Sequence, residues 1–236
     1  MDTNPKNPVI GDRSFGDDPD LVGRLGAAMI AGLQDEGVAA CAKHFPGHGD
    51  TDLDSHLDLP SVGHPRSRLE DVELRPFRRA IEAGVATVMA SHLLVRELDE
   101  ALPASLSRRV VTGLLREDMG FQGVVVTDDL EMKALSKHWT PARIGALAAQ
   151  AGCDLLAFCK SHDAQVEAME SVIRAVEAGE VPFKEAEAAE GRVRALKERF
   201  LAGYRDPDPR EARLLAGRAE HRALAESIAV RSGIPA

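Results

Sequence analysis

Two short segments of the sequence carry most of the side chains that could do chemistry. The first is KHFPGHGDTDLDSH, residues 43–56, in which three histidines and three aspartates accompany a Pro-Gly turn. The second is VTDDLEM, residues 126–132, in which Asp128 and Asp129 directly follow an apolar run. A carboxylate at the end of a buried strand and imidazoles on a nearby loop are typical of hydrolytic sites. The two segments could therefore serve one reaction.

One chemistry open to these residues is covalent glycosyl transfer. Asp128, fixed at a strand end, can attack an anomeric carbon while a second group protonates the departing oxygen. Asp54 and His56 suit the second role, because a histidine titrates near neutral pH and a carboxylate two residues away can orient its ring. Such a pair can act as an acid in one step and as a base in the next.

A metal-dependent hydrolytic site is the other chemistry. His44, His48 and His56, with nearby aspartates, offer suitable types of ligand. However, the spacing of His44 and His48 spans a Pro-Gly turn, so that their rings need not converge, and the segment at Asp128 would be left without a role. We therefore favour glycosyl transfer and expect no metal ion or other cofactor.

The pattern of apolar residues switches repeatedly between helical and strand-like spacing. Cap residues mark the helix starts: Asp18 before Pro19, a Ser67–Glu70 capping box, Ser107, and Thr140 before Pro141. Pro76 is expected to kink or restart the second helix. Short apolar runs predict four strands, at 38–45, 85–94, 124–127 and 154–158. After these the sequence predicts only helices, at about 163–179, 183–202 and 210–231.

Strands that alternate with helices indicate a parallel α/β sheet. Reactive side chains follow each of the four strands in turn: Lys43 and His44, then His92, then Asp128 and Asp129, then Lys160. Such dispersal over successive strand ends is typical of a (β/α)8 barrel, whereas a doubly wound sheet gathers its site at one switch point. We therefore predict a partial (β/α)8 TIM barrel with additional C-terminal helices.

The composition excludes several classes of protein. The 236 residues are 44% hydrophobic and 28% charged, as in an ordinary globular protein. A net charge of −9 argues against a nucleic-acid partner, and no apolar run approaches the roughly 20 residues that cross a membrane. Cys41, Cys153 and Cys159 lie in or beside apolar runs and lack a CxxC spacing, which predicts buried, reduced thiols in a cytoplasmic protein.

A series of linked motifs resembles glycoside hydrolase family 3. The motifs are KHFPGHG, DSH, LPSVGHPRSRLEDVELRPF, ASHLL and GFQGVVVTDDLEM, in this order. They are most similar to the β-N-acetylhexosaminidase branch, whose members remove N-acetylglucosamine, often from peptidoglycan fragments. DSH, residues 54–56, distinguishes this branch, because the family's β-glucosidases lack the dyad. The likeness runs from about Asp2 to Leu201.

The resemblance implies a role for each matching residue. Asp128 matches the nucleophile, His56 the acid/base and Asp54 its partner. The residues that match sugar-binding groups are Arg13, Lys43 and His44. Those expected to support the site are His48, His92, Asp129 and Met132. The substrate would be a saccharide containing N-acetylglucosamine, and the remaining histidines are expected on the surface: His64, His138, His162 and His221.

The resemblance also implies that part of the family's barrel is absent from this chain. Residues 1–203 would supply about the last four strands with their helices, and residues 204–236 a helical tail or a linker to an absent second domain. Open sheet edges would then favour self-association. A non-catalytic remnant is therefore an alternative function, and a β-glucosidase or a metal-dependent hydrolase is less favoured.

Overall fold

A computed structural model describes residues 1–7, 9–51 and 58–232, without the side chains of residues 12, 231 and 232. Contacts between Cα atoms divide the chain into two compact units, Met1–Phe200 and Leu201–Ala236. The described strands and both clusters of buried apolar residues belong to the first unit.

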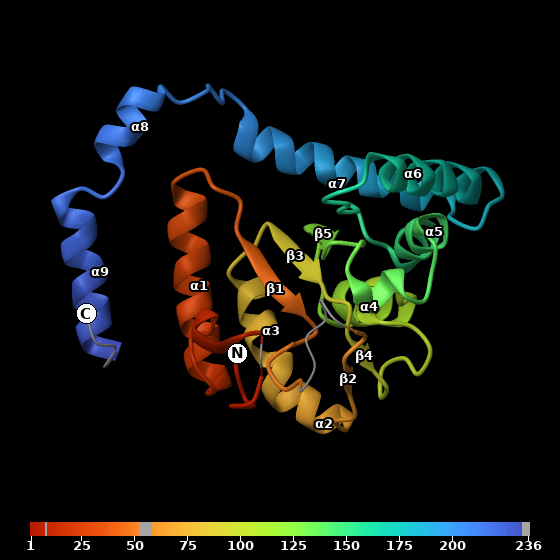
Figure 1. Ribbon diagram of the computed structural model, residues 1–236, viewed down its shortest axis with the longest axis horizontal. Helices are drawn as coiled ribbons and strands as arrows, with labels where there is room; N and C mark the ends of the chain where they lie inside the picture. The colour runs from red at the N-terminus through yellow and green to blue at the C-terminus, as the bar shows by residue number, and fades with distance from the viewer. Residues whose placement is uncertain (8, 52–57, 233–236) are drawn as a thin grey trace. The chain divides into compact units, whose positions relative to one another are not determined.

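Three parallel strands form the central sheet of the first unit, in the order β1 (Cys41–Phe45), β3 (Thr87–Ala90) and β5 (Val124–Thr127) (Figure 1). β5 agrees with the prediction, whereas β1 and β3 are shorter than the predicted runs. A second, two-stranded parallel sheet joins β2 (Ser61–Val62) to β4 (Leu94–Val95). Its strands are too short to leave a periodic signal in the sequence.

The predicted fourth strand, 154–158, is reduced to one parallel bridge between Leu155 and Val126. The Asp154 side chain accepts a hydrogen bond from the Val125 amide at 2.7 Å, so a carboxylate takes the place of a strand carbonyl there. The described residues therefore form a three-stranded α/β sheet and not a closed barrel. The α/β class with parallel strands is confirmed, and membership of a barrel stays a prediction.

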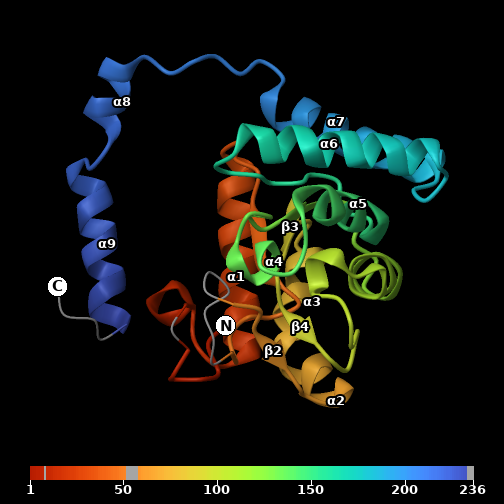
Figure 2. The ribbon, with the colours of Figure 1, turned by 45° about the vertical axis from the view of Figure 1, so that its right-hand side comes forward.

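Helices connect successive strands and cover the sheet. α1 and α3 pack side by side, as do α5 and α6 (Figures 1 and 2). Along the chain the helical elements of the first unit are η1 (Gly11–Arg13), α1 (Pro19–Asp35), α2 (Arg66–Arg68), the π-helix η2 (Leu69–Glu73), α3 (Arg75–Glu82), η3 (Ala104–Leu106), the π-helix η4 (Arg109–Asp118), α4 (Lys133–Ser136), α5 (Pro141–Ala151), α6 (His162–Glu177) and α7 (Phe183–Leu201).

Cap geometry confirms the predicted helix starts at Asp18 and Thr140. The Asp18 carboxylate accepts from the backbone amides of α1, and the Thr140 hydroxyl accepts from Arg143 at the start of α5. The predicted capping box at Ser67 is wrong, because the helix begins two residues earlier, at Arg66, with the extended residue Pro65 at the cap position. α3 restarts the helix at Pro76, as expected.

Two apolar clusters hold the first unit together. The larger lies between the central sheet and the helices α3 and η4, where the rings of Phe45 and Phe77 meet edge to face at 5.2 Å. The smaller surrounds Leu130 and Leu135 at the start of α4 and includes α5. Each fully buried leucine or phenylalanine contributes about 1.5–3 kcal/mol relative to an exposed one, so these clusters fix how the helices sit on the sheet.

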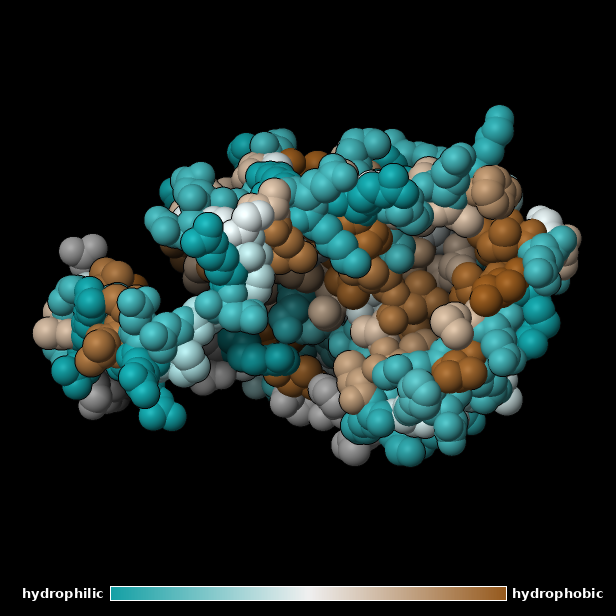
Figure 3. Space-filling model, turned by 90° about the horizontal axis from the view of Figure 1, so that it is seen from above, coloured by the Kyte–Doolittle hydropathy of each residue, from teal (hydrophilic) through white to brown (hydrophobic). Residues whose placement is uncertain are grey.

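The outer edge of the sheet remains exposed. β1 is an edge strand in the described sheet, and Leu25, Met29 and Leu33 on the adjacent α1 are also exposed. Cys41 is consequently exposed, as is Cys159 in the loop after the Leu155 bridge, whereas Cys153 is buried. The prediction of three buried thiols is therefore wrong for two of them. Figure 3 shows further apolar residues gathered between polar ones on the face seen from above.

The second unit contains the helices α8 (Pro209–Leu215) and α9 (Ala219–Ser232). A single helix was predicted for 210–231. The chain breaks at Gly217, whose φ of 68° lies in the left-handed region that interrupts a helix. No described helix of either unit is long and apolar enough to cross a membrane.

Candidate active site

The parallel sheet brings the predicted reactive residues to one edge. β1, β3 and β5 run in the same direction, so the residues at their carboxyl ends are neighbours. His44 lies near the end of β1, His92 follows β3, and Asp128 and Asp129 follow β5. Segments more than eighty positions apart in the sequence therefore meet at this edge.

Asp128 is held by its backbone, and its side chain is partly exposed. Its amide donates to the Ala90 carbonyl of β3 at 3.0 Å, and its Oδ1 accepts from the Asp129 amide at 2.9 Å. Oδ2 faces the Nε2 atom of His44 at 3.7 Å, and the side chain is 24% exposed. A carboxylate fixed in this way can approach an electrophile without first reorganising.

His44 is a neutral group beside this carboxylate. Burial lowers its pKa from 6.5 to about 4, against the opposing effect of Asp128, and the positive charges of Lys43 and Arg13 lower it further. The 3.7 Å separation is too long for a hydrogen bond. At neutral pH the imidazole is therefore uncharged and leaves the charge of Asp128 unpaired on this side, open to an incoming group.

Arg13, Lys43 and His44 line one pocket. Its volume is about 290 Å³, and it lies between α1 and β1 with His48 on the same wall. Lys43 is exposed, and the Arg13 guanidinium donates to the Val9 carbonyl through Nε at 3.1 Å. The three predicted sugar-binding residues are thus brought together. Asp128 lines a neighbouring pocket of about 500 Å³ instead, with Asp129, Met132 and Lys160 on its walls.

His92 is buried beneath Asp128 and joins two segments. Its Nε2 is 2.9 Å from the Asp129 carbonyl oxygen and its Nδ1 is 2.8 Å from the Ser105 hydroxyl. A carbonyl only accepts, so Nε2 carries the hydrogen and Nδ1 accepts from Ser105. Burial lowers the pKa of His92, which keeps this tautomer neutral. The ring therefore holds the backbone next to Asp128 and does not face the solvent.

Asp129 and Met132 line the same pocket as Asp128 and form hydrogen bonds within the turn after β5. The Asp129 carboxylate accepts from the amides of Glu131, at 3.1 Å, and Cys159, at 3.3 Å. Met132 is buried, and its amide donates to the Asp129 carbonyl. Both residues thus order the turn after β5.

His48 is buried in the turn after β1. Its Nδ1 is 2.9 Å from the Thr51 hydroxyl, and its carbonyl accepts from the Asn7 side chain at 2.7 Å. The Asn7 side-chain oxygen also accepts from the amides of Val9 and Ile10. The sequence analysis missed Asn7, although an Asn-Pro pair is a turn signal.

Asp54 and His56, the predicted acid/base pair, lie outside the described residues. The chain is described up to Thr51 and again from Asp58. Their expected roles therefore stay predictions.

The surface placement predicted for His64 is wrong. It is half-buried, and its Nε2 donates to the Asp50 carboxylate at 2.7 Å. His138, His162 and His221 are exposed, as expected. The contact of His64 joins positions fourteen residues apart and has no local signature in the sequence.

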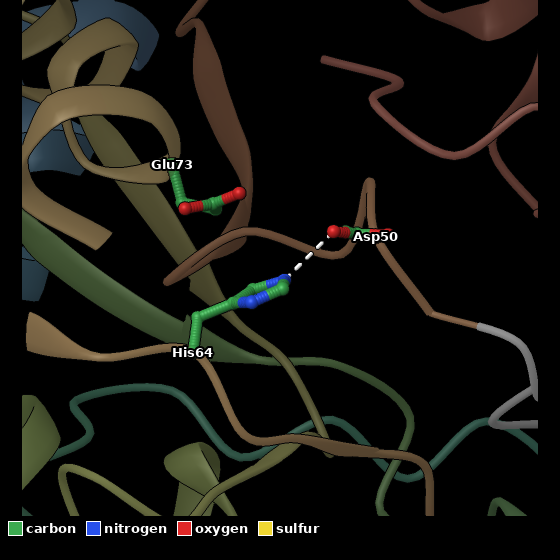
Figure 4. A group of neighbouring side chains, drawn as sticks. All are labelled: Asp50, His64 and Glu73. Carbon is green, nitrogen blue, oxygen red and sulfur yellow. Dashed lines mark hydrogen bonds and ion pairs between the residues drawn. The ribbon is translucent and has the colours of Figure 1, made fainter. Parts of the chain in front are cut away.

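Among the described residues one group combines the ligand types that a metal ion needs. Asp50, His64 and Glu73 place a ligand atom each within 4.8 Å of one another (Figure 4). However, the Arg68 guanidinium already donates to Asp50 and to Glu73, at 3.2 Å in both cases. The Arg68 guanidinium thus already supplies a positive charge to the two carboxylates, and a metal ion would have to displace it. His44 and His48 do not belong to such a group.

Comparison with known proteins identifies the class to which this fold and site belong. Residues 1–196 match the model of the glycosyl hydrolase family 3 N terminal domain. A beta-hexosaminidase of Thiobacillus denitrificans is 42% identical over 151 residues, which cover 64% of this chain and 42% of that protein. The chain therefore belongs to glycoside hydrolase family 3.

Solved structures agree with this assignment. A family 3 beta-N-acetylglucosaminidase from Paenibacillus sp. is 45% identical, with a TM-score of 0.85, over 88% of this chain and 40% of that one. A beta-glucoside phosphorylase is 26% identical, with a TM-score of 0.88, over 97% of this chain and 43% of that one. The chain spans less than half the length of the relatives it matches here.

Proposed function

We propose that this chain supplies the nucleophile of a retaining β-N-acetylhexosaminidase. The substrate would be a saccharide with a terminal N-acetyl-β-glucosaminide, including fragments of peptidoglycan. The observation that carries the proposal is the position of Asp128, whose partly exposed carboxylate lies at the common edge of the parallel strands beside a neutral imidazole. The likeness to beta-hexosaminidases supports the choice of substrate.

The reaction would proceed by two displacements. Asp128 attacks the anomeric carbon and the bond to the leaving oxygen breaks, while His56 gives that oxygen a proton. His56 then takes a proton from water, the water oxygen attacks the same carbon, and Asp128 leaves. Asp54 would orient the His56 ring in both steps. Two inversions at one carbon give net retention.

Sugar binding would fall to the pocket lined by Arg13, Lys43 and His44. Arg13 and Lys43 can only donate hydrogen bonds, which suits hydroxyl oxygens. Neutral His44 can donate to a hydroxyl with one ring nitrogen and accept with the other. His48, His92, Asp129 and Met132 would support the site from below, through the contacts described above.

The proposal also covers the domain organisation, the self-association and the cellular compartment of the protein. Residues 1–203 would form about the last four strands of a family (β/α)8 barrel with their helices, and residues 204–236 a helical tail or linker. The exposed edge of β1 would favour self-association. The free thiols are consistent with a cytoplasmic protein.

Replacement of Asp128 tests the proposal. In the protein at full natural length, Asp128→Ala should remove nearly all hydrolysis of an aryl N-acetyl-β-glucosaminide, because no covalent intermediate can form. A 2-fluoro sugar should label Asp128, as detected by peptide mass spectrometry. Unlabelled, inactive wild-type protein would instead indicate a non-catalytic remnant, and undiminished turnover by Asp128→Ala would refute the assignment of the nucleophile.

A further inference from the structure

A polar network connects three separate segments next to the proposed active site. It consists of Asp50, His64, Arg68 and Glu73, and we call it the Asp50 network. Asp50 ends the described turn after β1, His64 follows β2, and Arg68 and Glu73 belong to α2 and η2. His64 and Arg68 both donate to Asp50 Oδ2, at 2.7 Å and 3.2 Å, and Arg68 also donates to Glu73. Figure 4 shows His64 pointing toward Asp50.

Part of the network is charged and buried, which is energetically unfavourable. Glu73 is only 4% exposed, and its burial raises the pKa of the carboxyl group. Glu73 Oε2 and Arg68 Nε are buried and have no hydrogen-bond partner among the described residues. Well-packed apolar side chains would be at least as stable at such positions, so stability alone does not account for these residues. A role in fixing the relative positions of the three segments would account for Arg68 and Glu73.

Glu73 also supports the turn that carries His48. A Cβ atom on Gly47 would lie 2.8 Å from the Glu73 Cβ, so the turn backbone rests directly on this side chain. Gly47 has a φ of 135°, which a residue with a side chain rarely adopts. The network is therefore packed against the turn that follows Lys43 and His44, and does not lie free on the surface.

The two ends of the network bracket one stretch of chain. Asp54 and His56 fall between Asp50 and His64 in the sequence. On the Asp50 side, Thr51 is held by the Asn7 side chain at 3.3 Å. On the His64 side, the Pro60 carbonyl accepts from Leu94 at 3.0 Å. The Asp50–His64 hydrogen bond joins the chain just before this stretch to the chain just after β2, so it constrains the two sides relative to each other.

We propose that Asp50, His64, Arg68 and Glu73 are positioning residues for the acid–base step of the reaction. They fix the described residues on both sides of the stretch that carries the acid/base, and so they limit where a proton can be delivered. This inference rests on the proposed function. The network acts on proton transfer and not on the attack by Asp128, which is held separately by β3.

Two substrates separate these steps. A methyl N-acetyl-β-glucosaminide has a poor leaving group that needs a proton, whereas the 2,4-dinitrophenyl glycoside has a good one that does not. General acid catalysis contributes about 10²–10⁴-fold, so partial misplacement of the acid should cost about 10-fold or more on the methyl substrate alone. The readout is kcat/KM, which reports the first displacement for both substrates.

His64→Ala and Arg68→Met should lower kcat/KM for the methyl glycoside about 10-fold or more beyond any loss on the dinitrophenyl glycoside. His64→Gln should restore most of the rate, because its amide can still donate to Asp50. Arg78→Met is the matched control, since Arg78 pairs with Glu70 close by but does not touch the network. It should change both rates equally or not at all.

The outcomes are distinguishable. If wild-type protein at full natural length neither hydrolyses the dinitrophenyl glycoside nor becomes labelled at Asp128, the proposed function is wrong and this inference falls with it. If wild-type protein is active but the variants lose activity on both substrates in proportion, or on neither, the positioning role alone is wrong. Should His64→Ala or Arg68→Met fail to fold, His64→Phe and Arg68→Leu carry the same comparison, because neither side chain can donate to Asp50.

Discussion

The Nε2 atom of His92 donates a hydrogen bond to the backbone carbonyl of Asp129, the residue after Asp128, across 2.9 Å. This bond ties the end of β3 to the turn after β5. With the bond from the Asp128 amide to Ala90, it fixes the backbone on both sides of the Asp128 side chain. The placement of Asp128 therefore depends on a neutral buried ring as well as on the sheet.

Replacement of His92 should therefore lower the free energy of unfolding, and the loss should depend on how many of its hydrogen bonds the new residue can make. In His92→Phe the Asp129 carbonyl and the Ser105 hydroxyl lose their partner inside the protein, which costs about 1–3 kcal/mol. His92→Gln keeps a donor for Asp129 and should lose less. Urea unfolding at pH 7 measures both free energies. Equal losses in the two variants would show that only the volume of the ring matters.

Acid should weaken the fold through His44. Its pKa is lowered from 6.5 to about 4 in the folded chain, so the unfolded chain binds a proton first as the pH falls. The stabilisation from the neutral form is complete above pH 6.5 and is lost as the pH falls from 6.5 to about 4. It amounts to at most about 3.5 kcal/mol, since the pKa falls by about 2.5 units and each unit is worth about 1.4 kcal/mol.

The carboxylates of the protein also titrate below about pH 5, so the comparison must be a difference between variants. His44→Gln should remove the part of the pH dependence that falls between 6.5 and 4, when unfolding free energies are followed across this window. A wild-type curve parallel to that of His44→Gln would exclude a lowered pKa for His44.

Asp154 should be among the most sensitive positions of the first unit. Its side chain is 0% exposed and accepts from Arg116, from Arg192 and from the Val125 amide. In Asp154→Asn two guanidinium groups lose their counter-charge, and breaking a buried pair in this way costs about 3–5 kcal/mol.

Glu185→Gln provides the control for Asp154→Asn. Glu185 also pairs with an arginine, Arg108, but both side chains are about half exposed. Exposed pairs are worth about 0–1 kcal/mol, so this variant should unfold close to the wild type in urea. A loss as large as that of Asp154→Asn would mean that burial does not decide the strength of these pairs.

Lys43 should contribute to sugar affinity. A hydrogen bond from a charged group is worth about 1.5–3 kcal/mol, so Lys43→Met should weaken binding of N-acetylglucosamine about 10- to 100-fold. Isothermal titration calorimetry at full natural length gives the Kd without turnover. Lys184→Met, at the exposed start of α7, removes the same charge far from the pocket in sequence and should bind normally. Unchanged affinity in Lys43→Met would remove Lys43 from the proposed site.

The sequence predicts the elements that have a strong local signature. β5 consists of three valines and Thr127 between Gly123 and Asp128, and its bounds are as predicted. The caps at Asp18 and Thr140 are equally local and are also correct. The convergence of His44 and Asp128 follows from the parallel order of the strands.

The errors arise where tertiary contacts decide. The two-residue strands β2 and β4 exist only because they pair with each other. The apolar pattern predicts a strand at 154–158, but the Asp154 carboxylate accepts a hydrogen bond from the Val125 amide in place of a strand carbonyl. His64 has polar neighbours in the sequence, and only the fold brings Asp50 to it. The acid/base pair lies outside the described residues, so that part of the site stays a prediction from the sequence.

The exposure of Cys41 provides a site for attaching a fluorescent dye beside the proposed sugar pocket. Cys41 lines the same pocket as Lys43, and Cys153, whose thiol pKa burial raises to about 12, would stay unmodified by a fluorescent maleimide. Although Cys41 is exposed as a residue, desolvation of its sulfur by neighbouring atoms raises the pKa of the thiol, so labelling proceeds best at mildly alkaline pH. In a Cys159→Ser background, dye emission would register saccharides entering the pocket, even in variants with no turnover at all.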